Sequence, residues 1–253
     1  MTDIAANLRS VQARIADAAL RASRDPTEVR LVAVTKTLST DLVGAAYKLG
    51  LRHFGENRVE EAAGKVAVLP PDITWHMIGH IQSRKAKQVV QLMHCIHSVD
   101  SLRLAIQLDR LSLRRTSPLP VLLEINVSGE PSKSGLPAAQ WSADPGERQS
   151  LFSAIEDLVA LPHLKVEGLM TIAPIVSEAE QARPVFMSLR RLLDELRSRY
   201  PRSDWLHLSM GMTDDFEIAI EEGATMVRIG RAIFGHRPLT ARVAPATSHW
   251  SRA

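Results

Sequence analysis

The chain of 253 residues has a single cysteine, few aromatic residues and no strong excess of either charge. Because Cys95 is alone, an intrachain disulfide framework and a four-cysteine zinc site are excluded, and a reducing, cytoplasmic environment is favoured. Aromatic residues make up 4 % of the chain, and the net charge is +3 without a basic block interleaved with aromatics. This composition is not typical of a nucleic-acid-binding protein.

Extended apolar runs are missing as well. The first twenty residues carry charges throughout and lack the continuous apolar core of a signal peptide. No uninterrupted apolar stretch approaches the roughly 20 residues that a membrane-spanning helix needs. We therefore expect a globular cytoplasmic protein with no membrane and no nucleic acid among its partners.

Short apolar, β-branched runs alternate with amphipathic helical patterns along most of the chain. Eight runs are interpreted as strands: residues 30–36, 51–54, 73–78, 95–99, 121–127, 164–170, 205–208 and 225–229. Helices are predicted between them, and one more helix precedes the first strand, where apolar residues recur at helical spacing from Ile4 to Ile15. Such strands pair in parallel, because each crossover helix returns the chain to the same end of the sheet.

Eight strand–helix units in a chain of this length predict an α/β fold, a single-domain (β/α)8 barrel of the TIM type with an extra N-terminal helix. A doubly wound open sheet is the alternative, because alternation alone does not show that the sheet closes. The domain spans residues 1–253, with the barrel core at about 28–237 and a C-terminal tail at 238–253. The Gly-, Pro- and Ser-rich segment 128–149 is predicted to be a long loop after the fifth strand.

Lys36 is unusual because it ends the first predicted strand. Side chains alternate along a strand, so Lys36 shares a face with Val32 and Val34, and it lies at the barrel mouth if that face lines the interior. Desolvation would lower the pKa of its ammonium group, and the neutral amine is the form that attacks an aldehyde to give a Schiff base. The alternative is an ordinary lysine in a solvated loop.

The segments after the last two strands both contain glycine. Ser209–Thr213 (SMGMT) follows the seventh strand, and Gly230 with Arg231 follows the eighth. Phosphate sites of TIM barrels are commonly built from these two loops, so a phosphate cradle is predicted here. The alternative is turn chemistry, with Thr213 as a helix N-cap and Gly230 as a strand terminator.

Arg228 lies on the strand face opposite Val227 and Ile229, so it points into the barrel if that pair packs under helices. A buried guanidinium stays charged and needs an acceptor. The ring nitrogen of a cofactor would serve, and so would a carboxylate such as Glu124 or Glu167.

The remaining candidates for metal or nucleophile chemistry are histidines and the cysteine. Two histidine pairs are close in sequence: His76 with His80, and His94 with His97. Neither spacing matches a zinc-binding helix, so no metal site is predicted. Three other histidines flank predicted strands: His53, His163 and His207. Cys95 lies in an apolar strand and is predicted to be a core residue.

Six segments occur in the order AVTKT, HFGENRVEEA, WHMIGHIQSRK, INVSGEPSKSG, GLMTIAP and HLSMGMTDDFEIAIEEGATMVRIGRAIFG. They span roughly residues 30–236 and closely resemble the pyridoxal phosphate homeostasis protein family. The resemblance implies a single-domain barrel, similar to the N-terminal domain of alanine racemase, that holds pyridoxal 5′-phosphate (PLP) as a lysine aldimine. It also implies which residues bind this cofactor: Lys36, Asn57, Ser209, Gly211, Met212, Thr213, Arg228, Gly230 and Arg231.

The same resemblance implies roles within this set. Lys36 carries the aldimine, Asn57 lines the site, and Arg228 faces the pyridine nitrogen as a similar arginine does in alanine racemase. Arg231 stands where the family commonly has threonine, and Arg84 where it commonly has asparagine. An arginine beside the ring nitrogen keeps that nitrogen unprotonated, which weakens the ring as an electron sink.

A racemase also needs a second acid or base on the opposite face of its substrate. The chain has only two tyrosines, Tyr47 and Tyr200, and both are predicted to lie in helices far from the carboxyl ends of strands. In alanine racemase this group comes from an additional C-terminal domain, for which the segment after His236 is too short. The machinery for turnover is therefore expected to be absent.

These inferences predict a monomeric carrier or buffer of PLP that takes part in intracellular PLP homeostasis without robust turnover and without a catalytic residue. Its expected partners are PLP and the apo forms of PLP-dependent enzymes. Three alternatives stay open: a PLP-dependent amino-acid racemase of the alanine racemase type, a Schiff-base aldolase without cofactor, and an interaction module that displays loop 128–149.

Overall fold

The architecture is a closed barrel of parallel strands. The computed structural model describes residues 3–201 and 203–235, and eight parallel strands of these residues form the ring. In spatial order the ring consists of β1 (Arg30–Val34), β2 (His53–Glu56), β3 (Thr74–Met77), β4 (Cys95–Val99), β5 (Leu119–Asn126), β7 (Leu164–Met170), β8 (His207–Ser209) and β9 (Met226–Ile229). The pairings of β4 with β5 and of β9 with β1 close it, so the predicted TIM barrel is confirmed and the open sheet is wrong.

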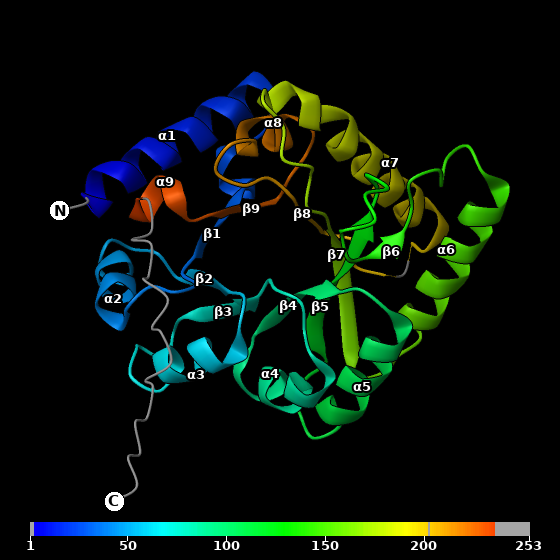
Figure 1. The fold of residues 1–253 in the computed structure, drawn as a ribbon, viewed down its shortest axis with the longest axis horizontal. Coiled ribbons are helices and arrows are strands. Elements are labelled where there is room, and N and C mark those ends of the chain that lie inside the picture. The colour runs from blue at the N-terminus through cyan, green and yellow to red at the C-terminus, as the bar shows by residue number, and fades with distance from the viewer. Residues whose placement is uncertain (1–2, 202, 236–253) are drawn as a thin grey trace, which may run out of the picture.

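Helices form an outer ring around the strands (Figure 1). They are α1 (Ile4–Arg21), α2 (Thr40–Lys48), α3 (Val59–Val66), α4 (Ala86–Leu92), α5 (Leu102–Ser112), α6 (Pro145–Val159), α7 (Arg183–Arg199), α8 (Phe216–Glu221) and α9 (Arg231–Phe234), with short 3-10 turns at Pro26–Glu28, Ser83–Lys85 and Ala179–Ala182. The extra N-terminal helix α1 packs against α8 and α9. The first and last parts of the described chain therefore meet on one side of the barrel. The predicted tail, residues 238–253, lies outside the described residues.

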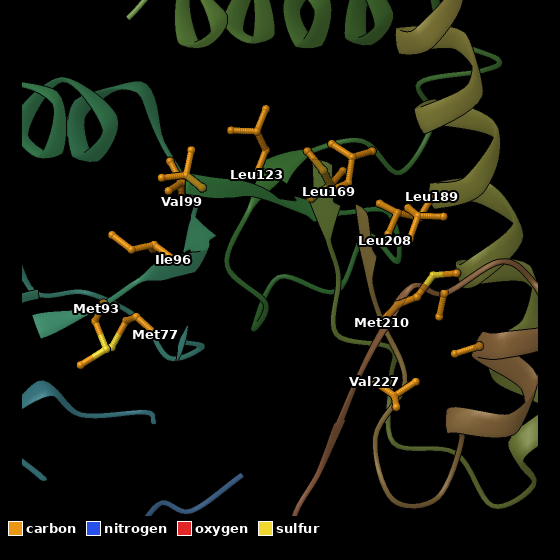
Figure 2. Close-up of a cluster of buried hydrophobic side chains, with 14 of the residues drawn as sticks. Met77, Met93, Ile96, Val99, Leu123, Leu169, Leu189, Leu208, Met210 and Val227 are labelled. Atoms are coloured by element: carbon orange, nitrogen blue, oxygen red, sulfur yellow. The ribbon is translucent and has the colours of Figure 1, made fainter. Parts of the chain in front are cut away.

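Alternation along the strands separates two cores. Outward-facing side chains such as Ile96, Leu123 and Leu169 pack beneath the helices (Figure 2). Full burial of each such side chain contributes about 1.5–3 kcal/mol relative to exposure. Leu122 and Met226 belong instead to a small separate cluster on the inward faces. The rest of the interior is unusually polar for a TIM barrel, whose lumen is ordinarily filled with branched apolar residues.

Part of the predicted loop 128–149 has regular structure. Its middle forms the two-residue strand β6 (Leu136–Pro137), which pairs with β5, and α6 already begins at Pro145 with Asp144 as its N-cap. Trp141 is buried, and its indole N–H donates to Ser188 Oγ. This anchoring argues against a module that displays the segment as a free loop.

A glycine is required where β7 meets β8. Gly168 has φ +153°, and an added Cβ would lie 2.0 Å from the carbonyl oxygen of His207. We expect Gly168→Ala to lower the free energy of unfolding by at least about 2 kcal/mol, because a strained φ and an overpacked contact each cost about 1–3 kcal/mol. Urea unfolding monitored by circular dichroism measures this difference.

The matched control is Gly64→Ala in α3, where an added Cβ has nothing within 4 Å. Alanine is the better helix former, so this variant should gain about 0.5–1 kcal/mol. Equal stability of the two variants would contradict the close approach of β7 and β8.

Candidate functional site

The predicted site residues come from the carboxyl ends of four strands that are neighbours in the barrel. Arg228 lies on β9, which pairs with β1 and β8, while β1 also pairs with β2. Lys36 follows β1, Asn57 follows β2, and Gly230 follows β9. The closed ring therefore brings segments from both ends of the sequence to one mouth.

The backbone just before Lys36 is fixed by a buried polar network. Thr35 Oγ1 donates to Glu56 Oε1 at 2.6 Å, and Lys65 Nζ donates to the same oxygen at 2.6 Å and to the carbonyl oxygen of Thr35 at 2.7 Å. All three of these residues are buried. The sequence motif around Glu56 was recognised, but its link to Lys65 was missed, because only the packing of α3 brings the two together.

The backbone just after Lys36 is strained. Thr37 has φ +65°, a left-handed conformation that a β-branched residue rarely adopts. Its N–H donates to Glu61 Oε2 at 2.8 Å, which holds the turn in place. Half-buried Lys36 is thus presented on a turn that is fixed on both sides.

Asn57 lines a cavity of about 620 Å³ together with residues of the loop after β3, among them His80 and Arg84. An added Cβ at Gly79 would lie 2.5 Å from the carbonyl oxygen of Asn57, so this loop is pressed against the Asn57 backbone. Arg84 Nε donates to Gln82 Oε1 at 3.0 Å. Lys36 is not among the residues that line this cavity.

The loop after β8 packs tightly on the helix that follows it. Gly211 has φ +92°, and an added Cβ would lie 2.6 Å from the Cβ of Ala219. Asp215, rather than Thr213, is the N-cap of α8, and its Oδ1 accepts from the N–H of Met212 at 2.6 Å. The alternative reading of Thr213 as the helix cap is therefore wrong.

The loop after β9 contacts β1 on one side and the loop after β8 on the other. Gly230 separates β9 from α9, as its reading as a strand terminator predicts, and an added Cβ would lie 3.1 Å from the carbonyl oxygen of Val34 in β1. Arg231 is exposed and forms an ion pair with Asp214 in the loop after β8. The two glycine-containing loops are thus tied together by a salt bridge at the mouth.

Arg228 points into the barrel and is buried. Its Nη1 donates to the carbonyl oxygen and to Oγ of Ser209, both at 2.7 Å, and its Nη2 donates to the carbonyl oxygen of Thr171 at 2.9 Å. Ser209 is itself 0 % exposed, so its hydroxyl lies behind Arg228 and not on the surface of the mouth.

No carboxylate forms an ion pair with Arg228 among the residues that the structure describes. Glu167 pairs with Lys165 at 3.1 Å, and Glu124 and Asp215 act on Arg228 only at longer range. Burial lowers the pKa of Arg228 to about 10, and the two carboxylates oppose this shift. The group stays charged at pH 7, and the expected alternative of a carboxylate partner is not what the structure shows.

Three histidines continue from Ser209 through the interior. His97 Nδ1 lies 2.9 Å from Ser209 Oγ, His76 Nδ1 lies 2.9 Å from His97 Nε2, and His53 Nδ1 lies 3.0 Å from His76 Nε2. Burial lowers the pKa of His53 to about 4 and the pKa values of His76 and His97 well below their usual value. All three rings are neutral at pH 7. No sequence pattern predicts this chain of histidines, because a histidine on a strand looks the same whatever it faces in the fold.

One group in the interior has the residue types of a metal site. Ligand atoms of His76, Cys95 and His97 lie within 4.8 Å of one another. Every ring nitrogen of the two histidines is already in a hydrogen bond, so a metal would have to break that chain. Burial also raises the pKa of the Cys95 thiol to about 12, which disfavours the thiolate that a metal needs.

Glu124 is a buried carboxyl on β5 near the mouth. Burial raises its pKa to about 7, Asp100 adds to the shift, and Arg228 and His80 oppose it. A titration near neutrality in this position makes Glu124 a candidate acid or base.

Both tyrosines lie at the opposite end of the barrel from Lys36. Tyr47 Oη contacts Asp72, which precedes β3, and the ring of Tyr200 lies beside Trp205, which precedes β8. Neither phenol is near the carboxyl ends of the strands.

No helix within residues 3–201 and 203–235 has the length and apolar character to cross a bilayer.

The chain matches known proteins over most of its length. A family model described as alanine racemase, N-terminal domain, matches residues 3–238. The chain is 43 % identical over 238 residues to the pyridoxal phosphate homeostasis protein of Pseudomonas aeruginosa, covering 94 % of this chain and 97 % of the relative.

The solved structures that are similar to the chain include two that contain pyridoxal phosphate. PipY of Synechococcus elongatus with PLP bound is 36 % identical with a TM-score of 0.75, covering 92 % of this chain and 100 % of that one. Alanine racemase from Bartonella henselae with covalently bound pyridoxal phosphate is 17 % identical with a TM-score of 0.63, covering 96 % of this chain and 61 % of that one, and it shares the fold.

The raised pKa of Glu124 predicts a pH dependence of stability. The folded state binds the Glu124 proton more tightly than the unfolded state, so this contribution is present below the usual carboxyl pKa and is lost as the pH rises through about 7. Between pH 5 and pH 8, wild type should lose up to about 3 kcal/mol relative to Glu124→Gln. Urea unfolding of both proteins across this range gives the difference, and parallel pH profiles would contradict the shift.

Proposed function

This chain belongs to the pyridoxal phosphate homeostasis protein family, and we propose that it binds PLP at the barrel mouth through Lys36 and serves as an intracellular carrier or buffer of this cofactor. When bound, PLP supplies an aldehyde that condenses reversibly with a primary amine and can later be released to another amine. A carrier needs that reversibility and a site that orients the cofactor, and it must not turn over substrates efficiently with the bound cofactor. The residues of the mouth fit these needs.

Arg228 carries the proposal. Its three hydrogen bonds to Ser209 and Thr171 leave further N–H groups of the guanidinium for one more acceptor. A pyridine nitrogen is such an acceptor when it is unprotonated. Because the guanidinium has no proton-accepting form and stays charged at pH 7, it holds that nitrogen unprotonated and keeps the ring a weak electron sink. A similar arginine faces the ring in alanine racemase, so Arg228 supports binding of PLP, while the argument for storage rests on the missing second acid or base.

The remaining groups fit the other two ends of PLP. Lys36 is half-buried and follows β1, which pairs with β9, the strand of Arg228. Its amine would meet the aldehyde of PLP at the mouth. The loops after β8 and β9 supply Gly211, Met212, Thr213, Gly230 and Arg231 for the phosphate, with backbone approach permitted by the glycines. Asn57 follows β2, which pairs with β1 on the side away from β9. Ser209 acts behind Arg228 and does not itself touch the phosphate.

The position of the tyrosines supports a carrier without robust turnover. Both phenols lie at the amino ends of the strands, so neither can reach a substrate at the mouth. We further propose that the chain acts as a monomer in the cytoplasm and passes PLP to apo forms of PLP-dependent enzymes. The lone buried cysteine agrees with a reducing compartment.

Amino-acid racemisation is the second candidate, and one observation favours it. Glu124 is buried at the mouth with a pKa raised to about 7, so it can exchange a proton near neutral pH. It is the residue that would serve as an acid or base if the protein turned over substrate.

We expect Lys36→Ala to abolish covalent attachment of PLP without loss of folding, because a half-buried lysine in a turn contributes little to the core. The measurement is the visible absorption of the protein with added PLP, followed by borohydride reduction and mass spectrometry of tryptic peptides. The matched control is Lys87→Ala, which removes an exposed lysine of α4 and should retain the reduced adduct at residue 36. An adduct in Lys36→Ala comparable with wild type would overturn the assignment.

Racemisation is tested with the PLP-loaded wild-type protein and single enantiomers of amino acids. We expect no sustained loss of optical activity, because the mouth lacks a phenol opposite Lys36. Sustained racemisation that is lost in Glu124→Gln would make the protein a racemase and Glu124 its acid or base. Sustained racemisation that survives this substitution would also reject the carrier and would place the proton transfer on another residue.

A further inference from the structure

Four side chains from four strands form one continuous hydrogen-bonded chain through the barrel interior. It runs from His53 on β2 through His76 on β3 and His97 on β4, then crosses to Ser209 on β8, with separations of 2.9–3.0 Å. It ends on Arg228 of β9, whose Nη1 lies 2.7 Å from Ser209 Oγ. The proposed binding of PLP uses Arg228 and gives the three histidines no part.

The chemistry of Arg228 sets the direction of the whole chain. A guanidinium only donates, so Ser209 Oγ accepts from Arg228 and has its own proton left for His97 Nδ1. A neutral imidazole that accepts at Nδ1 carries its proton on Nε2. His97 therefore donates to His76, and His76 donates to His53. The opposite direction would leave the hydroxyl proton of Ser209 without an acceptor in a residue that is 0 % exposed.

We propose that this directed chain, His53–His76–His97–Ser209, is a positioning device that stabilises the charge of Arg228 and holds its guanidinium toward the ring nitrogen of the cofactor. The inference rests on the proposed binding of PLP for the identity of that acceptor. The direction of the chain does not depend on it, because Arg228, Ser209 and the rings fix it among themselves.

The energetic reason is the missing counter-ion. A buried charge without an ion pair is costly unless polar groups surround it. The described residues give Arg228 three oxygen acceptors and no carboxylate in ion-pair contact. Behind Ser209 the three imidazoles lie head to tail, and each turns its acceptor nitrogen toward the guanidinium. In a low-dielectric interior such bonds polarise one another in the same sense, so their dipoles add.

The far end of the chain needs no further protein acceptor. His53 is half-buried and lines a cavity of about 550 Å³ at the amino ends of the strands, with Arg30 and Arg52 nearby. Water in that cavity can accept the Nε2 proton of His53. A protonated ring anywhere in the chain would instead place two donors face to face, so the arrangement admits only neutral histidines.

The first experiment tests the chain without the cofactor. Nitrogen-15 NMR of the histidine rings in the cofactor-free wild-type protein reports which ring nitrogen carries the proton, with assignments from single His→Gln variants. We expect His53, His76 and His97 to be neutral at pH 7 with the proton on Nε2. A proton on Nδ1 of His76 or His97, or a charged ring at either position, would overturn the proposal.

The second experiment tests the effect on Arg228 through the spectrum of bound PLP. His97→Phe keeps a ring but removes the hydrogen bonds to Ser209 and His76. We expect a shifted absorption maximum and PLP binding weakened at least about tenfold, because loss of one hydrogen bond that supports a charged group changes a binding constant by about that factor. His97→Gln can accept from Ser209 and donate to His76, and it should restore both properties. The control is His207→Phe on β8, which removes a half-buried ring bonded to Thr225 and outside the chain; it should behave as wild type.

The outcomes separate the two proposals. If the wild-type protein takes up no PLP, the proposed function is rejected. The NMR measurement of the ring protons then still tests the direction of the histidine chain, because it needs no cofactor. Unchanged affinity and spectrum in His97→Phe, with wild-type binding intact, reject the positioning role. If thermal unfolding shows that His97→Phe does not fold, His97→Gln and the wild-type tautomers decide: a shifted spectrum in the glutamine variant, or a proton on Nδ1, counts against the proposal.

Discussion

A positive charge inside a closed barrel is the constraint on which the interior depends. Arg228 is buried and lies out of ion-pair contact with the nearest carboxylates, so carbonyl oxygens of β8 and of the residue after β7 surround it. Ser209 joins that shell and passes the hydrogen bond on to His97. A TIM barrel ordinarily fills its lumen with branched apolar side chains. Here polar side chains from five strands replace part of that filling, and they form one hydrogen-bonded chain that ends on Arg228.

The amine at the mouth is held by a different means. Lys36 lies between Thr35, fixed by the buried pair of Glu56 and Lys65, and Thr37, whose left-handed backbone is kept by Glu61. Strain of this kind persists only where surrounding contacts over-determine it. Removing one partner of a buried ion pair costs about 3–5 kcal/mol, so the network below the turn is also a stability element. In this chain the backbone on both sides of Lys36 is therefore held rigidly.

Much of the fold followed from local patterns. The strands at Cys95–Val99 and Leu164–Met170 were predicted to the residue, because β-branched and apolar residues recur along each short segment and turns bound it on both sides. The strand Leu136–Pro137 was not predicted, since two residues next to proline carry no periodic signal and form a strand only by pairing with β5. The N-cap of α8 was placed at Thr213 as an alternative, but Asp215 fills that position, because the backbone of the loop continues to bend around Gly211.

The sequence alone determined the strand–helix alternation, the motifs around Lys36 and Gly211, and the placement of Arg228 on the strand face opposite Val227 and Ile229, because period and turn chemistry are local properties. Only the tertiary structure decided that the sheet closes, that Lys65 reaches Glu56, and that His97 meets Ser209 from the other side of the barrel. These last two residues are 112 positions apart, and no local pattern records a contact across a lumen. Closure of the barrel brings them together. Because Arg228 only donates hydrogen bonds, it then determines that Ser209 donates to His97.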